Sequence, residues 1–136
     1  MTPPTASVEE QVAAEAHTYV AQGRHLTLTL SGCPPHLLDD EQFLRELSER
    51  AVEATGAQVL STTSHHFEPQ GVTLLVLLAE SHASLHTYPE VGVAFWDCFT
   101  CGWQCDPLLS TDVLVEALAP TTVKQNCMLR GQGTDH

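Results

Sequence analysis

The chain has 136 residues, of which 43% are hydrophobic and 16% charged, a length and composition that predict one domain with a modest core. Five Lys and Arg stand against 17 Asp and Glu, a formal net charge of −12. This balance excludes nucleic acid and anionic membranes as main partners, because both require clustered cations. No apolar run approaches the ~20 residues of a membrane helix, and residues 1–10 carry no feature of a secretory signal, so we expect neither segment.

Local patterns predict six strands and three helices, the first of them a short one in the polar lead. In chain order they are a polar lead over 1–22 with a short helix at Val8–Gln22, a strand at His25–Leu30, a loop at Ser31–Pro35, a helix from Asp39 to Gly56, strands at Gln58–Phe67, Val72–Ala79, Ser84–Tyr88 and Val91–Thr100, a helix at Asp106–Leu118 and a strand at Thr121–Leu129. The continuous apolar run at 72–79 fits a strand buried on both faces or against a partner.

This order of elements predicts an α+β fold. We expect a two-layer α/β sandwich with a mostly antiparallel sheet and helices on one face. The other sheet face then needs a cover, and a symmetric dimer is the simplest one. Residues 23–130 form the predicted domain, between a polar lead at 1–22 and a polar tail at 131–136.

Five cysteines offer candidate chemistry, and their odd number favours reduced thiols and a cytoplasmic location over a disulfide scaffold. The spacing of Cys98, Cys101 and Cys105 is similar to that of zinc ligands. However, no turn-forming residue separates the first two, and an odd separation puts them on opposite faces of a strand. We therefore expect no metal there. A nucleophilic pair of Cys101 with His82 or His86 stays open beside a buried, inert cysteine.

A second candidate is the tetrapeptide Ala79-Glu80-Ser81-His82, where an apolar strand runs into polar residues with no Gly or Pro between. One interpretation is a strand end followed by a capped turn. The other is a serine whose hydroxyl attacks the preceding carbonyl, so that a peptide bond becomes an ester. Because a relaxed trans peptide resists such attack, the second interpretation predicts backbone strain at Glu80–Ser81.

Three motifs decide between these interpretations. HHFEPQGVT, AESHASLHTYPE and FTCG follow one another within SHHFEPQGVTLLVLLAESHASLHTYPEVGVAFWDCFTCG, residues 64–102. In order and spacing this segment resembles the bacterial S-adenosylmethionine decarboxylase proenzymes, and the surrounding strands and helices extend the resemblance over most of 24–130.

The resemblance implies a chain that cleaves itself between Glu80 and Ser81. The products are a β chain of 1–80 and an α chain of 81–136, with Ser81 converted into a pyruvoyl group. In the family, this ketone forms a Schiff base with the substrate amine and accepts electrons as CO₂ leaves. No metal and no pyridoxal phosphate is implied. His86 matches the histidine that assists processing, and Thr73 the hydroxyl that supports it.

The resemblance also implies roles in binding and turnover. Cys101 matches the proton donor to the substrate Cα, Phe67 the aromatic that stacks on adenine, and Glu90 the acid that binds the ribose hydroxyls. Tyr88 stands where relatives often carry Trp and is expected to be a pocket wall. The expected activity is decarboxylation of S-adenosylmethionine to the aminopropyl donor for spermidine biosynthesis, by a homodimer of cleaved αβ units.

Two alternatives remain at this point. The first is a pyruvoyl-dependent decarboxylase of another amino acid, such as ornithine or arginine, since processing residues do not fix the substrate. The second is an inactive partner subunit. The sequence assigns no role to residues 1–22 or to Cys33, Cys98, Cys105 and Cys127, and it leaves regulation by putrescine open.

Overall fold

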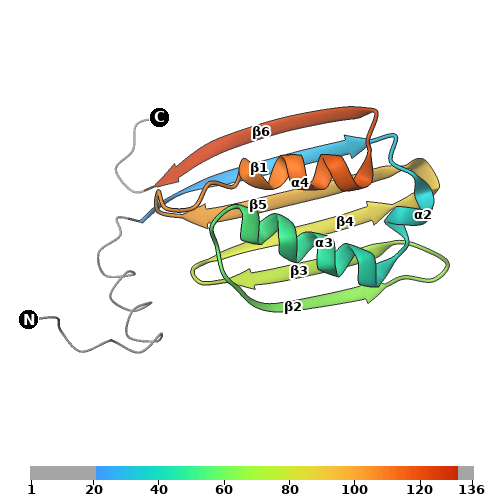
Figure 1. Cartoon of the computed structure of the whole chain (residues 1–136), viewed down its shortest axis with the longest axis horizontal. Helices are drawn as coiled ribbons and strands as arrows, with labels where there is room; N and C mark the ends of the chain where they lie inside the picture. The colour runs from blue at the N-terminus through green and yellow to red at the C-terminus, as the bar shows by residue number, and fades with distance from the viewer. Residues whose placement is uncertain (1–20, 132–136) are drawn as a thin grey trace, which may run out of the picture.

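A six-stranded antiparallel sheet with its two longer helices on one face makes up residues 21–131, the part of the chain that the computed structural model describes (Figure 1). The elements are β1 (Gln22–Ser31), α2 (Pro35–Leu38), α3 (Glu41–Ala54), β2 (Val59–His66), β3 (Val72–Leu78), β4 (Ser81–Tyr88), the 3-10 turn η1 (Pro89–Val91), β5 (Val93–Cys101), α4 (Leu109–Leu118) and β6 (Thr122–Gly131). The strand order is β2-β3-β4-β5-β1-β6. The predicted α+β sandwich is therefore confirmed.

The helix α3 illustrates why these residues form these elements. Asp40 caps its first turn by accepting a hydrogen bond from the Phe43 backbone N–H at 3.1 Å. Leu44, Leu47 and Ala51 recur at helical spacing and are fully buried against the sheet. The Ser110 hydroxyl of α4 accepts a hydrogen bond from the Trp96 indole of β5 at 3.1 Å. One core thus fills the space between the helices and the sheet.

Several predicted boundaries were wrong by a few residues. The predicted loop at 31–35 ends in a short helix, α2, and the strand expected from Ser84 begins at Ser81. The helix expected from Asp106 begins at Leu109, because the Asp106 carboxylate accepts from the Leu108 backbone N–H and forms a turn. The strand expected from residue 91 begins at 93, after η1. The helix predicted at 8–22 lies outside the described residues except at its last two positions, where it was wrong: Ala21 is in a bend and Gln22 begins β1.

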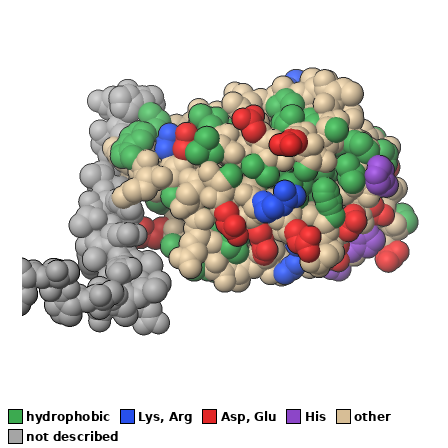
Figure 2. Space-filling model, viewed as in Figure 1, with side chains coloured by type: hydrophobic (Ala, Val, Ile, Leu, Met, Phe, Trp, Pro, Cys, Tyr) green, Lys and Arg blue, Asp and Glu red, His purple; other side chains and the backbone are tan. Residues whose placement is uncertain are grey.

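The sheet face opposite the helices, which we call the open face, carries exposed side chains. In β3, Val72, Leu74, Val76 and Leu78 point into the core, whereas Leu75 and Leu77 are 50% and 54% exposed. Burial of β3 on both faces within one chain was therefore a wrong prediction, and burial of the open face against a partner stays a prediction. Among residues 21–131 no helix is long and apolar enough to span a membrane. On the face drawn in Figure 2, acidic side chains are more widespread than basic ones.

Candidate functional site

The hairpin between β3 and β4 presents the predicted cleavage bond. Leu78 pairs with Ser81, so Ala79 and Glu80 form the turn between the strands. Glu80 has φ of 60°, in the left-handed region that costs a non-glycine residue about 1–2 kcal/mol. The strain expected at this bond is confirmed on its Glu80 side, and such strain is typical of functional sites.

Cys101, the last residue of β5, contacts both sides of this bond. Its backbone N–H donates to Ser81 Oγ at 3.1 Å, and its thiol donates to the Glu80 carbonyl oxygen at 2.9 Å. One residue therefore holds the attacking hydroxyl and the carbonyl that it would attack. A donor on that carbonyl oxygen stabilises the negative charge that develops there during attack.

Thr73 and His86 form a second group at the other end of the same hairpin. They are direct partners in the β3–β4 register, and Thr73 Oγ1 lies 3.1 Å from His86 Nδ1. Both line a cleft of about 300 Å³. The three residues predicted to bind substrate, Phe67, Tyr88 and Glu90, also line this cleft. Gln70, Gly71 and Thr87 complete its lining.

The cleft rim is held by a carboxylate that sequence reasoning did not single out. Asp39 Oδ1 accepts from the Gly71 backbone N–H at 2.9 Å and lies 2.8 Å from His66 Nε2. The Gly71 hydrogen bond, followed by that of His66, lowers the pKa of Asp39, and the Asp39 hydrogen bond raises the pKa of His66. The loop that carries Phe67 is thereby tied to α2, far away in sequence.

Within one chain the structure does not bring the two groups together. Ser81 and His86 are five residues apart along β4, roughly 17 Å at about 3.4 Å per residue. The Cys101 thiol contacts Glu80, whereas His86 contacts Thr73 and His82 faces Asp97, so neither histidine is the partner of the Cys101 thiol within the described residues. Glu80, Ser81 and Cys101 thus make one half-site, and the cleft with His86 makes the other.

The cysteine spacing that is similar to that of zinc ligands has a structural explanation. Cys98 is fully buried under the helices, whereas Cys101 lies on the opposite face of β5, as the odd separation predicted. Burial raises the pKa of the Cys98 thiol to about 12. Cys98 packs in the core on one face of β5 and Cys101 lies on the other face, so the two thiols do not share a ligand set.

Comparison with known proteins decides the family. The family model described as S-adenosylmethionine decarboxylase matches residues 24–131, which span both half-sites. The chain belongs to the S-adenosylmethionine decarboxylase family. The resemblance carried by the three motifs is therefore confirmed over the whole described domain.

Individual relatives support the same family. A protein of Brevibacillus brevis named S-adenosylmethionine decarboxylase proenzyme is 46% identical over 115 residues, 85% of this chain and 86% of its own. One of Prochlorococcus marinus with the same name is 50% identical over 96 residues, 71% of this chain and 79% of its own. The crystal structure of the adenosylmethionine decarboxylase from Aquifex aeolicus superposes with a TM-score of 0.77 at 32% identity, covering 86% of this chain and 97% of that one.

These relatives bear on the alternatives left open by the sequence. The S-adenosylmethionine decarboxylases reported above are named for that one activity, and two of them are named as proenzymes. The comparisons therefore give no support to ornithine or arginine as substrate, or to an inactive partner subunit.

Proposed function

We propose that this chain is a self-processing, pyruvoyl-dependent decarboxylase of S-adenosylmethionine that supplies the aminopropyl donor for spermidine biosynthesis. One observation carries the proposal: Cys101 contacts both the Ser81 hydroxyl and the Glu80 carbonyl of a strained turn. The names of the relatives, as proenzymes of this activity, fit a chain that must be cleaved first.

The proposed processing step uses atoms that the chain itself holds. Ser81 Oγ attacks the Glu80 carbonyl carbon, the C–N bond breaks, the Ser81 nitrogen takes up the hydroxyl proton and an ester forms. Loss of the Ser81 Cα proton then expels the Glu80 carboxylate and leaves dehydroalanine. Water adds, ammonia leaves, and residue 81 of an α chain 81–136 becomes a pyruvoyl group, beside a β chain 1–80. The proposed base is a histidine in the position of His86.

The residues around Ser81 fit this group and its reaction. When formed, the pyruvoyl group supplies a carbonyl that accepts electrons, which no ordinary side chain can do, so no metal and no pyridoxal phosphate is needed. Cys101 lies beside residue 81 and is proposed to hold the proton that returns to the substrate Cα. Phe67 would stack on adenine and Glu90 accept hydrogen bonds from the ribose, with Tyr88 as part of the cleft wall.

The separation of the half-sites supports a homodimer of cleaved αβ units. At roughly 17 Å, His86 cannot reach the Glu80–Ser81 bond of its own chain. A second chain placed against the open face in antiparallel orientation would bring its own His86 and cleft toward that bond. Leu75, Leu77 and Phe95 are 43–54% exposed on this face and would be buried by such a partner. We also propose a cytoplasmic location, where the thiol of Cys101 stays reduced.

Two measurements test the function. Intact mass spectrometry of the purified protein should show two fragments, the C-terminal one starting with a pyruvoyl group. CO₂ release from carboxyl-labelled S-adenosylmethionine, ornithine and arginine should occur with the first alone. Ser81→Ala, which lacks the attacking oxygen, should stay in one piece and release nothing. A wild-type chain that remains uncleaved after long incubation contradicts the proposal, as does release from ornithine or arginine only.

A further inference from the structure

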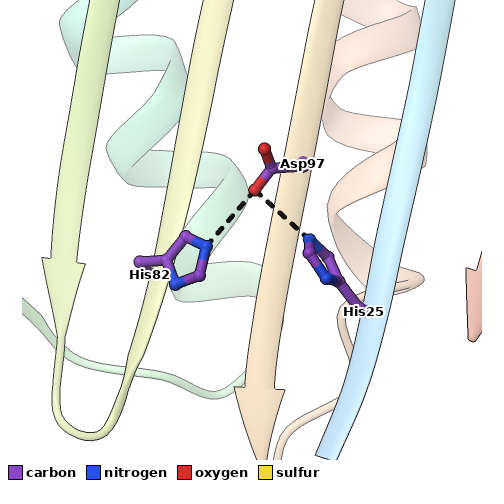
Figure 3. Close-up of side chains that lie close together, drawn as sticks. All are labelled: His25, His82 and Asp97. Carbon is purple, nitrogen blue, oxygen red and sulfur yellow. Dashed lines mark ion pairs between the residues drawn. The ribbon is translucent and has the colours of Figure 1, made fainter. Parts of the chain in front are cut away.

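Three polar side chains on the open face have no role in the proposed reaction. His25 of β1 and His82 of β4 both lie opposite Phe99 of β5, one on each side of it. Their rings approach edge to face, with centroids 5.9 Å apart. Asp97 comes two residues before Phe99 and therefore lies on the same face. Figure 3 shows the two imidazoles pointing toward one Asp97 carboxylate oxygen.

The distances within this group match those around a metal ion better than those of hydrogen bonds. Asp97 Oδ1 lies 3.5 Å from His25 Nε2 and 3.6 Å from His82 Nε2, and the three ligand atoms all lie within 4.8 Å of one another. Hydrogen bonds of this type are about 2.7–3.2 Å long. Zinc bonds of about 2.0–2.2 Å in a tetrahedron place neighbouring ligand atoms about 3.3–3.6 Å apart.

Two of these atoms are buried without another partner. His25 Nε2 and Asp97 Oδ1 are inaccessible to solvent and make no hydrogen bond within residues 21–131. The other Asp97 oxygen, Oδ2, accepts from the Ser84 hydroxyl at 2.8 Å. This contact fixes the carboxylate in the way that neighbours of metal ligands do, and it leaves Oδ1 directed at the two imidazoles.

We propose that His25, His82 and Asp97 form a binding site for a divalent cation of the zinc class. Two imidazole nitrogens favour Zn²⁺ over Mg²⁺ or Ca²⁺, which prefer oxygen ligands. Three protein ligands leave a fourth position for water. The ion would link β1, β4 and β5 beside Ser81, and the second copy proposed above would cover it. The proposed decarboxylase function neither requires this site nor supports it.

Arg130 of β6 would compete with this ion for His25. Its guanidinium lies 3.4 Å from His25 Nδ1 and 4.7 Å from the centre of the Phe99 ring. Since arginine only donates, this contact leaves the proton of a neutral His25 on Nε2, the atom that the ion needs. Metal binding moves that proton to Nδ1 and displaces Arg130. Arg130→Gln, which removes the guanidinium donor from Nδ1, should therefore bind the ion more tightly.

The test is a Co²⁺ and Zn²⁺ titration of the untagged full chain, as wild type and as uncleaved Ser81→Ala. One equivalent of Co²⁺ should give visible absorption bands without thiolate charge transfer, Zn²⁺ should displace it, and Mg²⁺ should not. His82→Gln should weaken Zn²⁺ binding at least about tenfold, as should Asp97→Asn. His82 has a 53% exposed side chain, so its variant should fold. His36→Gln, which removes an exposed histidine of α2, is the matched control and should bind as wild type.

Each result supports or overturns the metal site. Loss of Zn²⁺ binding in His82→Gln, with a gain in Arg130→Gln and no change in His36→Gln, supports it. So does a thermal midpoint that rises with Zn²⁺ in the wild type but not in His82→Gln. Undiminished binding in His82→Gln, thiolate bands that disappear in Cys101→Ser, or no bound metal at all would overturn it. The CO₂ assay is separate, so failure of this site is distinguishable from failure of the proposed function.

Discussion

The thiol of Cys101 lies 2.9 Å from the carbonyl oxygen of Glu80, on the bond that the chain is proposed to cut. The residue assigned to proton return in decarboxylation is thus in contact with the carbonyl that must first be activated for cleavage. One side chain would therefore serve both proposed reactions at the same place. Substitution of Cys101 should therefore affect cleavage and decarboxylation to different extents.

Cys101→Ala should slow cleavage without abolishing it, because the backbone N–H of residue 101 still holds Ser81 Oγ while the donor to the carbonyl is gone. Decarboxylation by the cleaved fraction should fall by about 10²-fold or more, as for loss of a general acid. Time courses of cleavage on denaturing gels and CO₂ release measure the two steps. Cys101→Ser, which keeps a donor, should cleave faster than Cys101→Ala. Full turnover by Cys101→Ala would refute the proton-donor role.

His86→Ala and Ser81→Ala should complement one another if the half-sites meet across a dimer. Each variant alone should stay uncleaved, because one lacks the histidine and the other the attacking oxygen. In a mixed dimer the Ser81 of one chain meets the His86 of the other, so the His86→Ala chain should be cleaved when both are co-expressed. Mass spectrometry identifies the cleaved chain. Cleavage of His86→Ala by itself at the wild-type rate would argue against a shared site.

Glu80→Gly should slow cleavage by relaxing the turn. Glycine adopts φ of 60° without the roughly 1–2 kcal/mol that Glu80 stores there, and a difference of that size changes a rate by about 5–30-fold. Glu80→Gln removes the charge but keeps the strained backbone, so it is the control and should cleave near the wild-type rate. Equal cleavage rates for the two variants would show that the strain does not contribute.

The Asp39–His66 pair should make stability depend on pH in a defined window. The raised pKa of His66 stabilises the fold below its ordinary value of 6.5, and this effect is lost as the pH rises through the raised value. The lowered pKa of Asp39 stabilises the fold above its ordinary value of 3.8, and this effect is lost as the pH falls through the lowered value. Asp39→Asn should therefore be most destabilising between about pH 4 and 6.5.

The quantity to measure is the loss in free energy of unfolding caused by Asp39→Asn, from urea unfolding of the uncleaved Ser81→Ala background at several pH values. Above pH 7 this loss should become smaller but should not disappear, because Asp39 still accepts a hydrogen bond from Gly71 when His66 is neutral. His66→Gln is the control and should remove only the part that depends on histidine charge. A difference between wild type and Asp39→Asn that is constant from pH 4 to 8 would rule out the ion pair.

The sequence predicted the main elements and, through the resemblance, the chemistry proposed for the Glu80–Ser81 bond. Alternation in β1, apolar spacing in α3 and the order of elements predicted the sandwich, because these are local patterns set by strand and helix periods. The three motifs identified Glu80, Ser81, His86 and Cys101 by type and order. The start of α4 was missed, because it depends on a single hydrogen bond that the Asp106 carboxylate accepts from the Leu108 backbone N–H.

Only the tertiary structure decided which of these residues meet. Ser81 and His86 are five residues apart in one motif, yet an extended strand holds them at opposite ends of a hairpin, whereas Cys101 reaches Glu80 from another strand. Asp39 reaches the cleft rim from the end of α2 by accepting a hydrogen bond from the Gly71 backbone N–H. His25, His82 and Asp97 come together because β1, β4 and β5 pair in register. Such contacts are set by strand pairing across the sheet, which no local pattern encodes.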